Sequence, residues 1–448
     1  MSLQSLDFDV LETIMSYVQS RDALPLTTMC RALHEPATRR LLSDISIHPN
    51  RQRDHYHGML FCDHMLANSA HRARYMRTLT LWPAGMNPVV LNHLAEVIRH
   101  ATNLRAFHLD TTDDAFYFCP PLADAFADAS SLTTIEFNFV SPEWMQPTSR
   151  LILDGADTVL SNLVGCLTMV TLNPNILDVL VDVEPRTVCP HARELVVGQG
   201  RFKSDHWELI SRVFPSTRIF RTQASPFGIG EAHTEWTTLD LVQTTNPILL
   251  RCYVTRLELD VNLDDVLVPE ESTYKPADYF ETLRCVSPVA LTCFVDLNRQ
   301  IVEWVTGHLI HLRVLHLMTC DLRWWHLRTD VAAWTDDTLR HLASTVASSK
   351  LRAVIIELPH NFPATRALLR SHAENIVARA GTVELVGIRC HAAMDRGISR
   401  IDKYTMTRYN WYRVERREND GSSQLNTLAQ DDVLRIVPGL LQSFEVAP

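Results

Sequence analysis

The stretch Leu-Arg-Val-Leu-His-Leu-Met-Thr-Cys-Asp-Leu, residues 312–322, contains the spacing on which the fold prediction is built. Leu312, Leu315 and Leu317 form a phrase of the type apolar-x-x-apolar-x-apolar. Side chains alternate between the two faces of a β-strand, so the last two apolar residues point the same way. The phrase therefore predicts a short strand with one buried face.

The same phrase recurs along residues 76–395. Its other clear copies are Met76-Leu79-Leu81, Leu104-Phe107-Leu109, Leu132-Ile135-Phe137, Leu167-Val170-Leu172, Ala192-Leu195-Val197, Val254-Leu257-Leu259 and Leu351-Val354-Ile356. Weaker copies are Trp236-Leu239-Leu241, Phe280-Leu283-Cys285 and Ala380-Val383-Leu385. The first five central residues stand at 79, 107, 135, 170 and 195, which gives spacings of 28, 28, 35 and 25 residues. Periods of this size indicate a solenoid of stacked units.

Helical patterns lie between the phrases, at residues 89–101, 122–129, 151–163 and 206–214. A strand followed by a returning helix cannot bury either face without a neighbouring unit, so we expect an α/β solenoid. The copy at 312–322 resembles a leucine-rich repeat, with Cys320 and Leu322 completing the phrase L-x-x-L-x-L-x-x-C-x-L. This resemblance implies a horseshoe. The alternative is a doubly wound α/β domain, whose strands would be continuous apolar runs.

Residues 6–42 predict three short helices ahead of the repeats. Asp9 and Glu12 have the spacing of a capping box that starts a helix at Val10, Asp22 is the expected N-cap of a second helix, and Pro36 the expected start of a third. Fewer than about 40 residues rarely form a stable core alone, so these helices need a partner surface.

The order of these helices, together with Met-Cys-Arg-Ala-Leu-His-Glu-Pro at residues 29–36, resembles an F-box of the fungal type. The resemblance implies docking on the Skp-type adaptor of a cullin-RING ubiquitin ligase. The residues that would supply this docking face and the packing behind it are Leu6, Val10, Leu11, Ile14, Val18, Leu24, Leu26, Met29, Cys30 and Leu33. The alternative is a helical cap that only seals the first repeat.

Composition and net charge limit the classes of function that the chain can have. The chain has 448 residues, 46% of them hydrophobic, and a net charge of -10, which argues against general binding to nucleic acid or to anionic membranes. The sequence does not start with a charged segment and an apolar run, and its ten cysteines are singly spaced. We therefore expect no secretory signal, reduced thiols, and a location in the cytosol, the nucleus or both.

Motifs for catalysis are missing from the sequence. There is no phosphate-binding G-x-x-x-x-G-K-[ST], no G-x-S-x-G and no H-E-x-x-H. His55, His57, Cys62, Asp63 and His64 form one short cluster, whereas zinc sites need two separated ligand pairs. We expect neither enzymatic activity nor a metal or other cofactor.

Residues that flank the buried positions of each strand should line the opposite, concave face. Over the eight clear copies these outward positions include six acidic residues and one basic residue, which predicts an acidic surface for a basic protein segment. The candidate target-binding residues are Trp82, His108, Asp110, Glu136, Glu258, Asp260, His316 and Glu357.

The expected domain organisation has four parts. These are an F-box-like helical domain (1–47), a connector (48–75), the solenoid (76–395) and a C-terminal cap (396–448). The basic and aromatic stretch 396–417 favours an edge-covering cap, with binding of single-stranded nucleic acid as the alternative. The sequence thus predicts a substrate-recognition subunit of an SCF-type ligase, or alternatively a protein-binding scaffold unconnected to ubiquitin.

Overall fold

The fold is taken from a computed structural model of the chain. The structure describes residues 6–47, 54–82, 86–111, 119–139, 167–172, 177, 188–198, 201–223, 225–226, 231–232, 234–262, 276–294, 299–318, 331–347, 349–358, 365–390, 409–416, 423–429, 431–433 and 435. The chain divides into two compact units, an N-terminal unit (Met1–Thr217) and a C-terminal unit (Arg218–Pro448).

The N-terminal unit opens with four helices: α1 (Phe8–Ser16), α2 (Ser20–Ala23), α3 (Leu26–Met29) and α4 (Arg31–Ser43). Asp7, not Asp9, is the N-cap of α1, so the expected capping box is wrong. The expected second helix is two single turns, α2 and α3, and the extended backbone of Cys30 then separates α3 from α4. Pro36 is the sixth residue of α4 and not its start.

A parallel sheet follows these helices. Its strands are β1 (Asp44–Ile47), β2 (Thr78–Leu81), β3 (Ala106–Thr111), β4 (Thr134–Phe139), β5 (Met169–Leu172) and β6 (Glu194–Val197). Other elements of this unit are α5 (Asp54–Leu66), α6 (Ser69–Arg72), the 3-10 turn η2 (Ala73–Tyr75), α7 (Pro88–Arg99), α9 (Pro120–Ala127), β7 (Arg201–Phe202) and α12 (Ser204–Val213). The first strand, β1, thus lies within the predicted helical domain, and α5 lies within the predicted connector.

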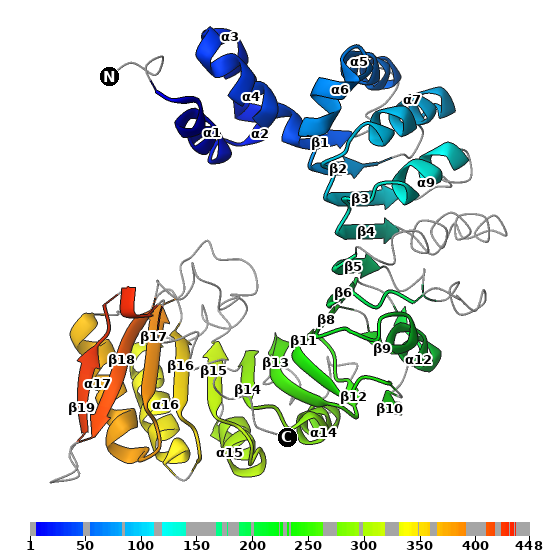
Figure 1. The fold of residues 1–448 in the computed structure, drawn as a ribbon. Helices are drawn as coiled ribbons and strands as arrows, with labels where there is room; N and C mark the ends of the chain where they lie inside the picture. The colour runs from blue at the N-terminus through cyan, green and yellow to red at the C-terminus, as the bar shows by residue number, and fades with distance from the viewer. Residues whose placement is uncertain are drawn as a thin grey trace. The chain divides into compact units, whose positions relative to one another are not determined.

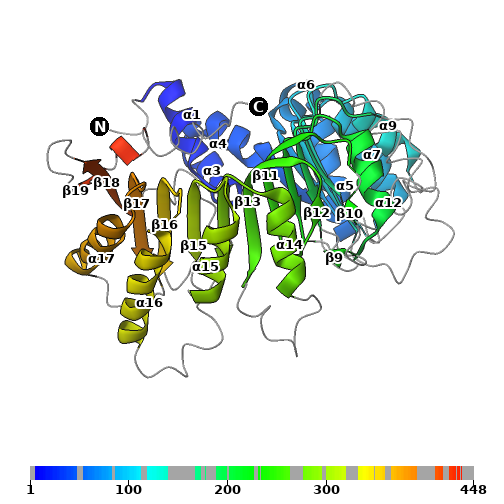
Figure 2. The same ribbon diagram turned by 90° about the horizontal axis from the view of Figure 1, so that it is seen from below.

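Local sequence explains where these helices begin and how they pack. The side chain of Asn87 accepts a 2.9 Å hydrogen bond from the backbone N–H of Val89, and a proline follows at the first helical position of α7. In the next repeat, Phe126 of α9 stacks on Phe107 of β3 with ring centroids 3.6 Å apart. In both units the helices between consecutive parallel strands lie along one face of the sheet (Figures 1 and 2). A doubly wound domain would have helices on both faces.

The C-terminal unit continues the same alternation. Its elements are β8 (Ile219–Thr222), β9 (Ser225–Pro226), β10 (Glu231–Ala232), β11 (Thr238–Thr244), β12 (Leu249–Leu250), β13 (Tyr253–Asn262), α14 (Pro276–Val286), β14 (Ala290–Phe294), α15 (Arg299–His308), β15 (Val314–Met318), α16 (Val331–Val346), β16 (Ala353–Leu358), α17 (Arg366–Arg379), β17 (Leu385–Cys390), β18 (Asn410–Arg416) and β19 (Ser423–Thr427). Strands β8, β11 and β13–β17 pair in parallel, and β18 and β19 add antiparallel strands beyond β17. Each unit is therefore a repeat-built α/β sheet, as the sequence predicted.

All eight clear copies of the repeat phrase form strands of these sheets. The weaker copies are less accurate. Phe280-Leu283-Cys285 lies in the helix α14. In the copy Ala380-Val383-Leu385, the residue that pairs with Val354 of the preceding strand is Val386 and not Val383. In β11 the buried residue after Leu239 is Val242 and not Leu241. The predicted helix at 151–163 and the end of the leucine-rich phrase at Cys320 and Leu322 lie outside the described residues.

A second apolar core covers part of the sheet face opposite the helices in the C-terminal unit. This C-terminal cluster consists of Val289, Val314, Ala353, Ile355, Leu385, Tyr409, Trp411 and Val433. Trp411 of β18 lies directly over Gly387 of β17, where an added Cβ would stand 2.6 Å from the indole ring. The C-terminal segment therefore buries strand positions that the sequence predicted to be open.

Candidate functional site

The four N-terminal helices have a small core of their own. Leu11 and Met15 of α1 pack against Leu33 and Ala37 of α4, and all four are buried. Four further residues predicted to support docking pack against this core and are half-buried: Leu6, Val18, Leu26 and Cys30. Leu11 and Leu33, each 2% exposed, thus hold the helices together and are not available to a partner.

Other apolar residues of the same helices face solvent. Val10, Ile14 and Tyr17 are exposed by 44%, 39% and 86%, and their spacing of four and three residues places them on one face of α1. We call these three residues the α1 stripe. Leu24, two residues before α3, and Met29, the last residue of α3, are exposed as well. Four of the ten residues predicted for docking are thus exposed, namely Val10, Ile14, Leu24 and Met29, whereas Tyr17 was not among the predicted residues.

The concentration of these residues is unusual within the described part of the chain. Ten large apolar side chains are exposed there, and six lie between residues 8 and 29. The other four, Leu60, Val89, Val188 and Ile310, are scattered. Exposed apolar residues that occur singly need no explanation, whereas a group of them marks an interaction site.

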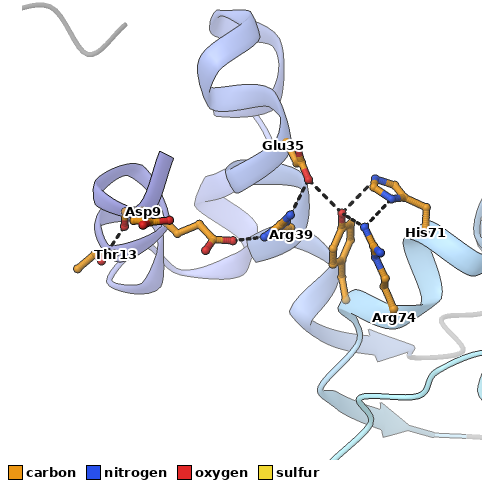
Figure 3. A network of polar contacts seen from close by, with 8 residues as sticks. Asp9, Thr13, Glu35, Arg39, His71 and Arg74 are labelled. Atoms are coloured by element: carbon orange, nitrogen blue, oxygen red, sulfur yellow. Dashed lines mark hydrogen bonds and ion pairs between the residues drawn. The ribbon is translucent and has the colours of Figure 1, made fainter. Parts of the chain in front are cut away.

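Arg39 links helices α1 and α4 to the first repeat (Figure 3). Its guanidinium donates hydrogen bonds to Glu12 of α1 and, at 2.6 Å, to Glu35 of α4. It also lies over the rings of Phe8 and Tyr75, 4.9 and 5.2 Å from their centroids. The hydrogen bond from Arg39 lowers the pKa of Glu35 below its ordinary value, so this carboxylate stays charged. Arg39 thereby joins α1, α4 and η2.

Arg40 connects the same helices to strand β1 through hydrogen bonds. Arg40 Nε donates to the carbonyl of Val18 at 2.6 Å, and its Nη1 hydrogen-bonds the carboxylate of Asp44, the first residue of β1. Burial opposes ionisation of Asp44, but hydrogen bonds from Arg40 and Ser20 prevail and lower its pKa. The helices are therefore attached to the sheet as a terminal cap would be, while the α1 stripe remains exposed.

A cleft of about 820 Å³ lies beside Arg39, between the helices and the entry points of β2 and β3. Its lining includes five arginines, Arg39, Arg40, Arg74, Arg77 and Arg105, and one acidic residue, Glu12. The sequence prediction missed this site. A signal was present, because Arg77 and Arg105 stand 28 residues apart and each directly precedes a strand of a consecutive repeat.

On the open strand face of the N-terminal unit, the predicted residues are half-buried. His108 and Glu136 are register partners on β3 and β4, with 2.5 Å between His108 Nδ1 and Glu136 Oε2. Trp82 follows β2 and donates its backbone N–H to the carbonyl of Ile47. Asp110 lies in β3, but its side chain is outside the described residues. Trp82, His108 and Glu136 are the candidates on this face whose side chains the structure describes, and Asp110 stays a prediction.

The candidates in the C-terminal unit do not form an open acidic surface. Glu258 is buried and pairs with Arg256 at 2.7 Å, and Asp260 is half-buried, with burial and the charge of Glu258 raising its pKa. His316 and Glu357 are buried beneath the C-terminal segment. The prediction that these residues face a target is wrong for Glu258, His316 and Glu357, because all three are buried, the last two beneath Tyr409.

Buried polar groups of this unit form one network under the C-terminal cluster. Glu357 Oε1 lies 3.2 Å from His316 Nε2 and accepts a hydrogen bond from the Tyr409 hydroxyl. Its other oxygen accepts a 2.7 Å hydrogen bond from Arg389. Together with the Arg256–Glu258 pair, this arrangement buries Glu258 and Glu357, two acidic positions that the sequence prediction counted as exposed charge. The basic target stays a prediction.

The described part of the basic and aromatic stretch, residues 409–416, belongs to the C-terminal sheet through β18. Tyr409, Trp411 and Tyr412 are buried, and Arg416 donates hydrogen bonds to the carbonyls of Ala380 and Val383. Bases of single-stranded nucleic acid stack on exposed aromatic rings, which these three residues do not offer. Their positions support the cap and not the nucleic-acid alternative.

The described residues contain no cluster of three or more His, Cys, Asp or Glu side chains arranged for a metal ion. In the candidate cluster of α5, Cys62 is fully buried, and burial raises the pKa of its thiol to about 12. Among the helices that the structure describes, none has both the length and the apolarity to cross a membrane.

No protein-family model matches the sequence, and comparison with curated proteins also finds no match. Among solved structures, the chain is similar to the leucine-rich repeat-containing protein LegL7 from Legionella pneumophila. The TM-score is 0.38 and the sequence identity 9%, over 75% of this chain and 98% of that one. The repeat architecture described above stands on the strand registers of this chain alone.

Proposed function

We propose that the chain is the substrate-recognition subunit of an SCF-type cullin-RING ubiquitin ligase. Helices α1–α4 would dock on the Skp-type adaptor, and the repeats would hold a target protein. The observation that supports this best is the exposed α1 stripe, Val10, Ile14 and Tyr17, on the helices whose sequence resembles an F-box. A cap that served only its own chain would have no need of this stripe.

Burial of the α1 stripe would supply the driving force for docking on the adaptor. Fully covering an aliphatic side chain contributes about 1.5–3 kcal/mol before the cost of association is subtracted. Leu24 and Met29 add apolar area on the neighbouring turns. Several such residues together give stable docking, provided that the helices keep their arrangement when bound, which the Leu11–Leu33 core favours.

In this role the chain itself forms no covalent bond. Its contribution is proximity, because a target held by the repeats is brought near a ubiquitin-charged enzyme that other subunits supply. Arg39 and Arg40 support such a role, since they fix the docking helices to η2 and β1. The assembly would work in the cytosol or the nucleus, where the eight described cysteines stay reduced.

Ile14→Asp is expected to abolish co-purification of the full chain with a Skp-type adaptor. A charge at the centre of an apolar interface typically weakens binding by about 2 kcal/mol or more, which is roughly a 30-fold increase in Kd. The matched control is Ile310→Asp, which makes the same change at a residue that is 63% exposed in the C-terminal unit. Capture of the adaptor on immobilised chain measures both variants.

Two outcomes would contradict the proposal. One is that wild-type chain does not retain the adaptor, and the other is that Ile14→Asp retains it as well as Ile310→Asp does. Circular dichroism shows whether Ile14→Asp stays folded, and Val10→Asp provides a second variant of the same stripe.

The alternative function is a protein-binding scaffold unconnected to ubiquitin. It is favoured by the attachment of the helices to β1 through Arg40, Ser20 and Asp44, which is what a terminal cap requires. If Ile14→Asp unfolds the repeats as well as the helices, the cap alternative is correct, because a docking residue on the surface should not affect repeat stability.

A further inference from the structure

We propose that the arginine-lined cleft between the N-terminal helices and the start of β2 and β3 binds an anionic segment of a partner protein. The ligand would present carboxylate or phosphate groups to Arg74, Arg77 and Arg105. The site is separate from adaptor docking, because none of these arginines belongs to the α1 stripe.

The charge of the cleft is the first support. Five arginines and one glutamate line it, so the lining carries 5 - 1 = +4, although the whole chain has a net charge of -10. A concave, positively charged wall concentrates its field and raises the local concentration of anionic ligands. In an acidic protein such a concentration of positive charge needs a local reason.

The arginines divide by what they contact. Arg39 is paired with Glu12 and Glu35, and Arg40 with Asp44, so these two are used within the fold. Arg74 Nη2 contacts His71 Nδ1 at 2.8 Å and the Tyr75 hydroxyl at 3.3 Å. Arg39 and Arg40 therefore shape the wall of the cleft and do not provide its available charge.

The available charge belongs to Arg74, Arg77 and Arg105. Within the residues that the structure describes, no carboxylate lies in ion-pair distance of these three side chains, and all three are exposed. The backbone N–H of Arg105 donates to the carbonyl of Arg77 at 2.8 Å. This hydrogen bond places the two arginines side by side on adjacent repeats. Two forked donors at neighbouring positions suit bidentate recognition of carboxylate or phosphate oxygens.

The rest of the lining indicates a polar segment of polypeptide. Thr13, Ser16, Ser43 and Asn103 provide hydroxyl and amide groups, and the apolar wall consists of Met15, Pro36 and the ring of Tyr75. A volume of about 820 Å³ exceeds that of a single inorganic anion and accommodates a few residues of extended chain. Charge and hydrogen bonds, not an apolar anchor, would therefore provide specificity.

Fluorescence anisotropy with the full chain and labelled short peptides tests the proposal. One peptide alternates Glu and Ser, a second replaces the acidic residues with phosphoserine, and a third has Gln in place of Glu. We expect the first two to bind at least roughly tenfold more tightly than the third, with affinity falling as salt is added. The stronger of the two anionic peptides identifies carboxylate or phosphate as the preferred group.

Charge reversal locates the binding. Arg77→Glu and Arg105→Glu should each weaken binding of the anionic peptide by roughly tenfold, whereas Arg413→Glu, an exposed arginine on β18, should not. Thermal unfolding confirms that the variants remain folded, since neither side chain packs in the core. Equal binding of neutral and anionic peptides, or unchanged binding by both cleft variants, would overturn the proposal. Tighter binding of a single-stranded oligonucleotide of equal charge would also overturn it, because the cleft would then be a nucleic-acid site.

Discussion

Trp411→Ala is expected to lower the free energy of unfolding of the C-terminal unit by about 3–5 kcal/mol, the usual cost of removing a large aromatic side chain from a core. Trp411 is 1% exposed and packs in the C-terminal cluster, which joins β18 to strands β15, β16 and β17. Loss of the indole would leave a cavity and loosen the segment that covers this face. Denaturant unfolding followed by circular dichroism measures the change. The control is Trp82→Ala, because the side chain of Trp82 is only half-buried.

The same contact can be tested from the opposite strand. Gly387→Ala would place a methyl group 2.6 Å from the Trp411 ring and should cost about 1–3 kcal/mol through overpacking. Gly381→Ala is the matched control, because nothing lies within 4 Å of the added Cβ. If Trp411→Ala and Gly387→Ala both unfold at the wild-type denaturant concentration, the C-terminal segment does not cover the sheet as described.

Glu357→Ala is the second substitution for which we expect a large effect, about 3–5 kcal/mol of destabilisation. Glu357 is fully buried, and its carboxylate contacts His316, Arg389 and Tyr409. Removing the carboxylate breaks the 2.7 Å ion pair with the buried Arg389 guanidinium. Thermal and denaturant unfolding measure the loss. Stability equal to that of wild type would contradict the network.

The pH dependence of the free energy of unfolding should reveal the ionisation of Glu357. Burial raises the pKa of Glu357, but hydrogen bonds and charges from His316 and Arg389 prevail and lower it to about 2. A pKa below the ordinary value means that the stabilisation is present above about pH 4.5 and is lost as the pH falls toward about 2. The Tm of wild type should therefore fall more steeply with acidification than that of Glu357→Gln. Parallel Tm profiles for the two proteins would contradict this assignment.

The strands were predictable where the spacing of apolar residues has only one interpretation. Leu315 and Leu317 alternate as a strand requires, and so do the other clear copies. Strand β1 was missed although Leu42, Ile45 and Ile47 have the same spacing, because Leu42 was assigned to the third predicted helix. Phe280 and Leu283 were assigned to a strand although a spacing of three also fits one face of a helix, which is what α14 forms.

The sites were less predictable because burial depends on contacts between distant segments. In α1, Leu11 and Ile14 are equally apolar in sequence, but only Leu11 packs against α4. Similarly, His316 has the alternation of an open strand face, yet Tyr409, 93 residues later, covers it. The arginine cleft combines residues from α4, η2 and two strand entries, so only the repeat spacing of Arg77 and Arg105 was available as a sequence signal.

Hydrogen–deuterium exchange of the full chain, with and without a Skp-type adaptor, tests the docking role of the α1 stripe most directly. We expect the adaptor to slow amide exchange between residues 8 and 29, which hold the exposed apolar side chains, while exchange in β3 and β4 is unchanged. Unchanged exchange across residues 8–29 at saturating adaptor would contradict the proposed function.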